Sequence, residues 1–181
     1  MTTTSSLDDA AGTLTLRTGV TGRAARMGHR LTIAMRSWRI TVDCDGDTPV
    51  TARLVVDVDS LQVVSGEGGL TPLSGPEKTL VRANALKTLD AKRFPTVEFD
   101  AESIQPRDGG YLLHGPLTVH GVSRPVEVAL DVADDGSAHR LRVRTEVRHS
   151  DHKVKQYSTA MGAMKVADVV AVEFDATADH S

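Results

Sequence analysis

Alternation of apolar and polar residues is the strongest pattern in the sequence, and it is clearest over residues 110–132. Apolar side chains recur at every second position on both sides of a short polar segment, residues 120–124. A period of two is typical of a strand with one buried face. Gly121 favours a turn because glycine adopts positive φ at little cost, and Pro125 cannot donate to a ladder. The pattern therefore predicts two antiparallel strands joined as a hairpin.

The same alternation recurs along most of the chain and predicts an all-β fold. Between Met35 and Trp38 the apolar phase changes, so we expect a bulge or bend that keeps both side chains inward. Short turns favour an antiparallel up-and-down order, and the expected architecture is an eight-stranded barrel. The strands are expected near residues 12–19, 29–44, 49–60, 95–104, 110–119, 125–133, 138–149 and 166–177.

One helical insertion is expected between the third and fourth of these strands. Residues 65–69 are rich in glycine and indicate a flexible linker within the domain. Ser74 with Glu77 three residues later is the pattern of a capping box. Apolar residues then follow at helical spacing, and we expect them to lie on the barrel. They are Leu80, Ala83, Leu86 and Leu89, with Val81 and Ala85 beside them.

Length and composition limit the choice of function. A chain of 181 residues suits one domain with a sizeable core. The net charge of -3 and the aromatic content of 3% argue against nucleic-acid binding. The single cysteine, Cys44, cannot form an internal disulfide, which fits a reducing compartment.

The first eleven residues lack both the basic start and the apolar core of a signal peptide. We therefore expect a disordered N-terminal lead over residues 1–11, a barrel domain over residues 12–177, and a cytoplasmic location. No apolar run is long enough to span a bilayer, which leaves at most a peripheral contact with membranes.

Polar candidates for chemistry are few. His149, Asp151 and His152 have ligand types that suit zinc or iron, but their segment shows little helical character and implies no third ligand. His114 and His120 can act as acid or base, yet no nucleophile elbow or triad accompanies them. The sequence therefore predicts no metal, no cofactor and no enzymatic activity.

Three stretches together resemble a known family. The segment LTVHGVSRPV, residues 117–126, resembles the motif LTxxGvT(R/K)Pv of the YceI-like family, the lipocalin-like polyisoprenoid-binding proteins. Upstream, LDAKRFPTVEF at residues 89–99 resembles the family element lda.kyPt..F, and residues 172–174 resemble its closing strand. The likeness spans nearly the whole chain. It implies a lipocalin-like barrel and an isoprenoid ligand, a ligand class that comes from the resemblance alone.

An eight-stranded barrel either fills with side chains or encloses one small ligand. The residues expected to face inward are mostly valine, leucine and alanine, which make a dry apolar lining. Our first hypothesis, based on the resemblance, is a non-catalytic protein that binds, transports or sequesters an isoprenoid or other long-chain apolar lipid in the lumen. The expected ligand-binding residues are Met35, Trp38, Val56, Phe99, Leu113, Leu117, Val128, Val143, Met161 and Phe174.

Two alternatives stay open at this point. A filled barrel would be an interaction scaffold that uses its outer surface, including the arginines between positions 140 and 148. Those arginines suit an acidic lipid surface, or an ordinary solvated strand face beside Glu98 and Glu102. The less favoured alternative is an enzyme that uses loop histidines at the mouth. The sequence also leaves a homodimer open.

Overall fold

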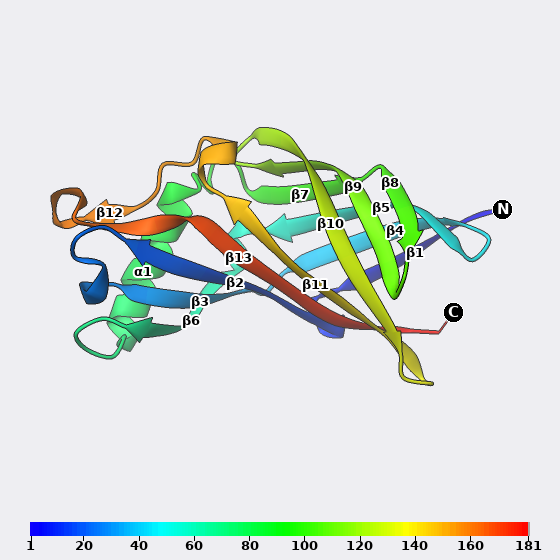
Figure 1. Ribbon diagram of the computed structural model, residues 1–181, viewed down its shortest axis with the longest axis horizontal. Helices are drawn as coiled ribbons and strands as arrows, with labels where there is room; N and C mark the ends of the chain where they lie inside the picture. The colour runs from blue at the N-terminus through cyan, green and yellow to red at the C-terminus, as the bar shows by residue number, and fades with distance from the viewer. Residues whose placement is uncertain (181) are drawn as a thin grey trace.

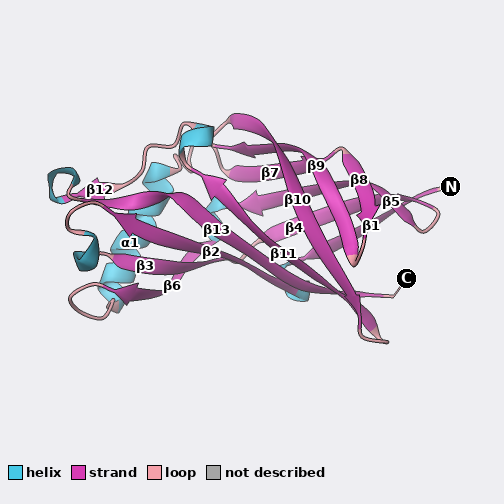
Figure 2. Ribbon diagram, in the orientation of Figure 1, coloured by secondary structure: helices cyan, strands magenta, loops and turns pink. Residues whose placement is uncertain are grey.

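The computed structural model describes residues 1–180 as an all-β fold with one helix (Figure 1 and Figure 2). Within those residues, 13 strands form one antiparallel sheet. The helix is α1 (Gly75–Thr88), and the short 3-10 turns are η1 (Asp9–Ala11), η2 (Ala25–Met27), η3 (Val58–Ser60), η4 (Ser150–His152) and η5 (Ala160–Gly162). The strands are β1 (Thr2–Asp8), β2 (Gly12–Thr21), β3 (His29–Met35), β4 (Trp38–Asp45), β5 (Thr48–Asp57), β6 (Leu61–Gly68), β7 (Thr96–Ala101), β8 (Ser103–Arg107), β9 (Gly110–Val119), β10 (Val122–Asp134), β11 (Ala138–Arg148), β12 (Ser158–Thr159) and β13 (Met164–Asp179).

The sheet curls into an antiparallel half-barrel, and register shifts interrupt three of its ladders, namely β13 with β2, β3 with β6 and β4 with β5. The hydrogen-bonded order is β1-β4-β5-β7-β9-β10-β11-β13-β2-β3-β6. Strands β1 and β2 follow one another in the chain, yet β1 pairs with β4 and β2 pairs with β13. The residues that join β1 to β2 therefore connect two distant places in the strand order. The sheet curls toward itself and has an inner and an outer face (Figure 1).

The prediction of eight strands is wrong in number, whereas the antiparallel all-β class is confirmed. The expected strand over residues 29–44 is two strands, because Arg36 and Ser37 interrupt it between β3 and β4. This break is the bend expected from the change of phase. Met35 and Trp38, on its two sides, are only 6% and 4% exposed. Two short strands, β8 and β12, add to the count by pairing with β9 and β13.

Two segments without a strand pattern also join the sheet. Residues 1–11 are not a disordered lead: β1 pairs with β4 along its whole length, and the Thr4 hydroxyl donates to Asp43 Oδ1 at 2.7 Å. Alternation could not reveal this strand because its side chains are mostly polar. The expected linker at residues 65–69 instead continues β6, which pairs with β3 as far as Gly68. Helix α1 therefore follows β6, and not the third of eight strands.

The capping box of α1 is confirmed. The Ser74 amide donates to Glu77 Oε2 at 2.6 Å, and the Glu77 amide donates to Ser74 Oγ at 3.3 Å. The apolar face is only partly the one expected, since Leu80 is 62% exposed. Spacings of four residues place another set of side chains together toward the barrel. The residues of α1 and its C-cap that pack against the core are Val81, Ala85, Leu86 and Leu89.

The predicted hairpin at the centre of the sequence pattern is present, with a shorter turn than expected. Strands β9 and β10 are joined by His120 and Gly121 alone, and both have positive φ, 53° and 70°. Two positive φ angles are what a two-residue hairpin turn needs to match the twist of its strands. Pro125 lies within β10 opposite Pro116, so the two prolines oppose each other in the ladder.

Candidate functional site

The inner face of the sheet can be traced through the strand pairing, because directly paired residues share a face. Phe174 of β13 is buried and pairs with Val143 of β11, which in turn pairs with Leu130 of β10. Strand period then places Val128 and Val126 on the same inner face. This face of β10 is apolar from Val126 to Val132.

All but one of the residues predicted to line the lumen lie on this inner face. The exception is Met161, which lies in η5 with φ 56° and is fully exposed. The prediction that Met161 faces inward is wrong because strand alternation does not extend through a 3-10 turn. That the others contact a ligand stays a prediction. They are Met35, Trp38, Val56, Phe99, Leu113, Leu117, Val128, Val143 and Phe174.

Part of the interior, around Trp38 and Phe174, is filled with side chains. Trp38 begins β4 and packs its ring edge to face with Phe174, with ring centroids 5.3 Å apart. The indole Nε1 of Trp38 is buried and has no hydrogen-bond partner among the described residues. The buried core cluster around the pair comprises Leu14, Ile33, Met35, Val56, Leu61, Val63 and Ala176.

The inward side chains of the wall formed by β9, β10 and β11 are less buried than this cluster. The inward residues of β10, from Val126 to Val132, are only half-buried, while the outward residues between them are exposed. Leu113 and Leu117 of β9 are half-buried too. Side chains on the inner face of a filled barrel would be buried, so these residues form an apolar wall that solvent reaches.

An opening in the wall lies between β10 and β11. The two strands pair only between residues 130–134 and residues 139–143, and they diverge toward the start of β10 (Figure 1). Within the described residues, no ladder pair joins residues 122–129 to residues 144–148. A cavity of about 270 Å³ occupies this opening. Its lining residues are Leu117, Arg124, Pro125, Val126, Glu146, Val147, Arg148, Asp151 and His152.

Hydrogen bonds from β10 and β13 hold turn η4 beside the opening. His152 is 2% exposed, and its Nδ1 donates to the Val122 carbonyl at 2.8 Å. Arg124 Nε donates to the Asp151 carbonyl at 2.9 Å. From β13, Asp168 accepts from the amide and the hydroxyl of Ser150, at 2.8 and 2.6 Å. These bonds from Ser150 hold the pKa of Asp168 below its usual value, so η4 is tied to a carboxylate that stays ionised.

Residues 5–178 match the family described as YceI-like domain. This chain belongs to the YceI-like family. Among solved structures, the YceI-like chain is similar to BcnA of Burkholderia cenocepacia, with 20% identity, a TM-score of 0.69, and coverage of 95% of this chain and 99% of BcnA. It is also similar to the YCEI protein of Campylobacter jejuni, with 14% identity, a TM-score of 0.59, and coverage of 82% and 84%. No curated protein sequence matches at a significant level. The structural likeness confirms the fold.

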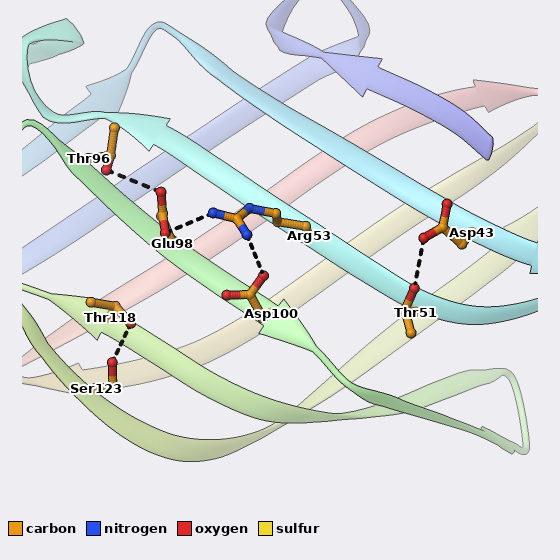
Figure 3. Close-up of polar contacts among 8 residues, drawn as sticks. All are labelled: Asp43, Thr51, Arg53, Thr96, Glu98, Asp100, Thr118 and Ser123. Carbon is orange, nitrogen blue, oxygen red and sulfur yellow. Dashed lines mark hydrogen bonds and ion pairs between the residues drawn. The ribbon is translucent and has the colours of Figure 1, made fainter.

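Polar side chains of this YceI-like fold are paired on its outer face (Figure 3). Arg53 of β5 reaches two carboxylates of β7, with Nη2 3.0 Å from Glu98 Oε2 and Nη1 3.4 Å from Asp100 Oδ1. At the hairpin, the hydroxyls of Thr118 and Ser123 are 2.6 Å apart. These polar groups therefore have partners on the outer face and need none from the lumen.

Two arginines of β11, Arg140 and Arg142, pair with Asp175 of β13, and not with Glu98 and Glu102 as the sequence suggested. Arg140 Nη2 lies 2.7 Å from Asp175 Oδ2, and Arg142 Nε lies 3.4 Å from the same oxygen. The hydrogen bond from Arg140 holds the pKa of Asp175 below its usual value. This pairing supports an ordinary solvated strand face over a free cationic surface.

Sequence reasoning missed most of the opening. Arg124 could be singled out only as part of the family motif, and His152 only as a histidine in a long loop. The bond from His152 to Val122 joins residues 30 positions apart, so no local pattern signals it.

In residues 1–180, no helix has the length and apolar character needed to cross a membrane. The cytoplasmic location stays a prediction.

Proposed function

We propose that this YceI-like protein binds one long apolar molecule, an isoprenoid or related lipid, in its lumen and carries or sequesters it without chemical change. The observation that supports the proposal is the apolar inner wall of β9, β10 and β11, where inward side chains such as Leu113, Val126 and Val128 are only half-buried. Apolar surface that solvent reaches inside a concave wall favours occupation by an apolar ligand. Family membership supports the same proposal.

The energetics favour a long hydrocarbon over a small polar metabolite. Each buried CH₂ contributes about 0.8 kcal/mol, so about ten of them contribute roughly 8 kcal/mol. Association costs about 4–15 kcal/mol, and a ligand must therefore bury many carbons before it binds stably. Isoprenoid and acyl chains meet this requirement with few polar atoms to desolvate.

The opening between β10 and β11 is the proposed entry to the lumen. Its cavity combines apolar residues from the inner face, such as Val126 and Val147, with residues of both charges at its rim. The charged residues are Arg124, Arg148, Glu146 and Asp151. Such an entrance suits a chain with a polar end, since the end can stay among these charged residues while the chain enters. Inside, the unpaired Nε1 of Trp38 offers one hydrogen bond to a ligand acceptor.

The first experiment is mass spectrometry of the purified protein, in its native state and after organic extraction. We expect one apolar molecule per chain, released chemically unchanged. Protein stripped of lipid should then bind geranylgeraniol or palmitate added as defined probes. A protein that is isolated empty and takes up neither probe would contradict the proposal and favour the filled-barrel scaffold.

A matched pair of variants locates the ligand. Val128→Trp places a large ring on the inner face of β10, whereas Ala129→Trp places the same ring on the exposed outer face. We expect Val128→Trp to abolish probe binding and Ala129→Trp to leave it unchanged, with the strand signal in circular dichroism kept by both. Equal binding by the two variants would contradict a ligand in the lumen.

The filled-barrel scaffold is the second candidate, and the packed cluster around Trp38 and Phe174 is the observation that favours it. Under that alternative the half-buried wall would remain empty and partner proteins would bind outside. The absence of enzymatic activity, the absence of nucleic-acid binding and the homodimer stay predictions.

A further inference from the structure

Three side chains of metal-ligand type meet where β10 and β13 end and β11 begins, away from the opening described above. Asp134 of β10 pairs directly with His139 of β11, and His139 pairs with Ala178 of β13. His180 lies two positions beyond Ala178, and so on the same face of the chain. One ligand atom from each of Asp134, His139 and His180 lies within 4.8 Å of the other two.

The contacts within this cluster leave ligand capacity unused. His180 Nε2 is 3.3 Å from Asp134 Oδ1, and the rings of His139 and His180 stack with centroids 4.3 Å apart and planes at 12°. His139 Nδ1 is buried and has no hydrogen-bond partner among the described residues. A buried polar atom without a partner keeps its full desolvation penalty, so stacking alone does not explain this histidine.

We propose that Asp134, His139 and His180 bind one divalent transition-metal ion of the Zn²⁺ or Ni²⁺ kind, with water completing the coordination. Two imidazoles and one carboxylate suit such ions. The Gly136 amide donates to Asp134 Oδ1 at 2.8 Å and orients that carboxylate, as outer partners of metal ligands commonly do. The parity of strand residues places the cluster on the inner face, because His139 shares its face with Leu141 and Val143.

Metal binding requires a small rearrangement that the site permits. Bonds of about 2.0–2.1 Å place tetrahedral ligand atoms about 3.4 Å apart, closer than the 4.8 Å limit observed. Imidazole lone pairs also lie in the ring planes, so two parallel stacked rings cannot both point at one ion. His180 follows the last residue of β13, and its side chain is 41% exposed. Its ring can therefore turn out of the stack, while His139 stays in the sheet.

The test is a titration of the full chain with Zn²⁺ alone, by calorimetry and by competition with a chromophoric chelator. Any affinity tag is removed first, because a polyhistidine tag binds the same ions. We expect one equivalent to bind, and His139→Gln and His180→Gln each to weaken binding at least about tenfold, the loss that even an outer-shell partner causes. His114→Gln, on the outer face of β9, should bind Zn²⁺ as the unchanged protein does.

Nuclear magnetic resonance and lipid uptake complement the Zn²⁺ titration. The imidazole proton resonances of both His139 and His180 should shift on addition of one equivalent of Zn²⁺. His180 lies beyond the last strand, so the variant His180→Gln tests the site even if His139→Gln fails to fold. Binding no tighter than about 1 mM, or binding that neither substitution weakens, would overturn the proposal. Lipid uptake by the same variants is a separate readout, so failure of the metal site does not affect the proposed lipid function.

Discussion

Trp38 and Phe174 meet edge to face across the interior, with ring centroids 5.3 Å apart and ring planes at 74°. They come from β4 and β13, which are not neighbours in the sheet. The contact therefore joins two walls through the lumen, and both residues are at least nine-tenths buried. It marks the part of the interior that is filled with side chains, beside the wall that stays half-buried.

Phe174→Ala should lower the free energy of unfolding by about 3–5 kcal/mol, the usual loss for removing a buried phenylalanine. The lost volume lies between two walls that are each held by strand pairing, so they cannot collapse onto it. Urea denaturation followed by circular dichroism measures the change. Phe174→Leu, which keeps apolar volume, should cost clearly less. Equal losses for the two variants would show that the aromatic contact and its volume do not stabilise the interior.

Gly115→Ala should destabilise the sheet by about 3 kcal/mol, at the upper end of overpacking effects. A Cβ at this position of β9 would clash with the Asp100 carbonyl oxygen, an atom of the backbone that cannot move aside. Gly75→Ala is the matched control, because a Cβ there meets no atom within 4 Å. Thermal unfolding compares the two. A stable Gly115→Ala protein would show that β9 can move away from the end of β7.

Ser74→Ala should cost about 1 kcal/mol of stability, the typical value for removing an N-cap side chain. The Glu77 amide then loses its acceptor at the start of α1. Because α1 packs on the core through Val81, Ala85 and Leu89, fraying should also weaken that contact. Chemical denaturation measures the loss, with Lys87→Ala, a change at an exposed position of the same helix, as control. A loss no larger than that of the control would mean that the capping box does not stabilise the protein.

Asp168→Asn should lower stability at pH 7 and have a smaller effect in acid. The pKa of Asp168 is lowered by its hydrogen bonds from Ser150, so ionised Asp168 favours the folded protein. That contribution is present above the ordinary aspartate pKa of about 3.9 and is lost as pH falls through the lower folded value. Urea denaturation at pH 7 and pH 3 should show the difference between the two proteins shrinking.

The control for this pH dependence is Asp108→Asn, a change at an exposed turn residue. Hydrogen exchange at η4 adds a local readout, since Asp168 holds Ser150 in that turn. A difference between Asp168→Asn and the unchanged protein that stays constant from pH 7 to pH 3 would contradict the assigned role of the carboxylate.

The sequence by itself determined the features that depend on local chemistry. Alternation identified most strands and the residues that face inward, because strand period fixes the face of each side chain. The capping box at Ser74 and the positive φ of Gly121 followed from single residues and their spacing. The family was also predictable, since its motifs lie within short segments such as residues 117–126.

Only the tertiary structure decided which parts of the chain meet. Polar β1 became a strand because β4 offers it a ladder, and Met161 turned outward because η5 breaks the alternation. The contact of His152 with Val122 joins residues 30 positions apart, and His180 meets Asp134, which lies 46 positions before it. Such contacts carry no local period in the sequence, since they arise from the way the sheet bends and closes on itself.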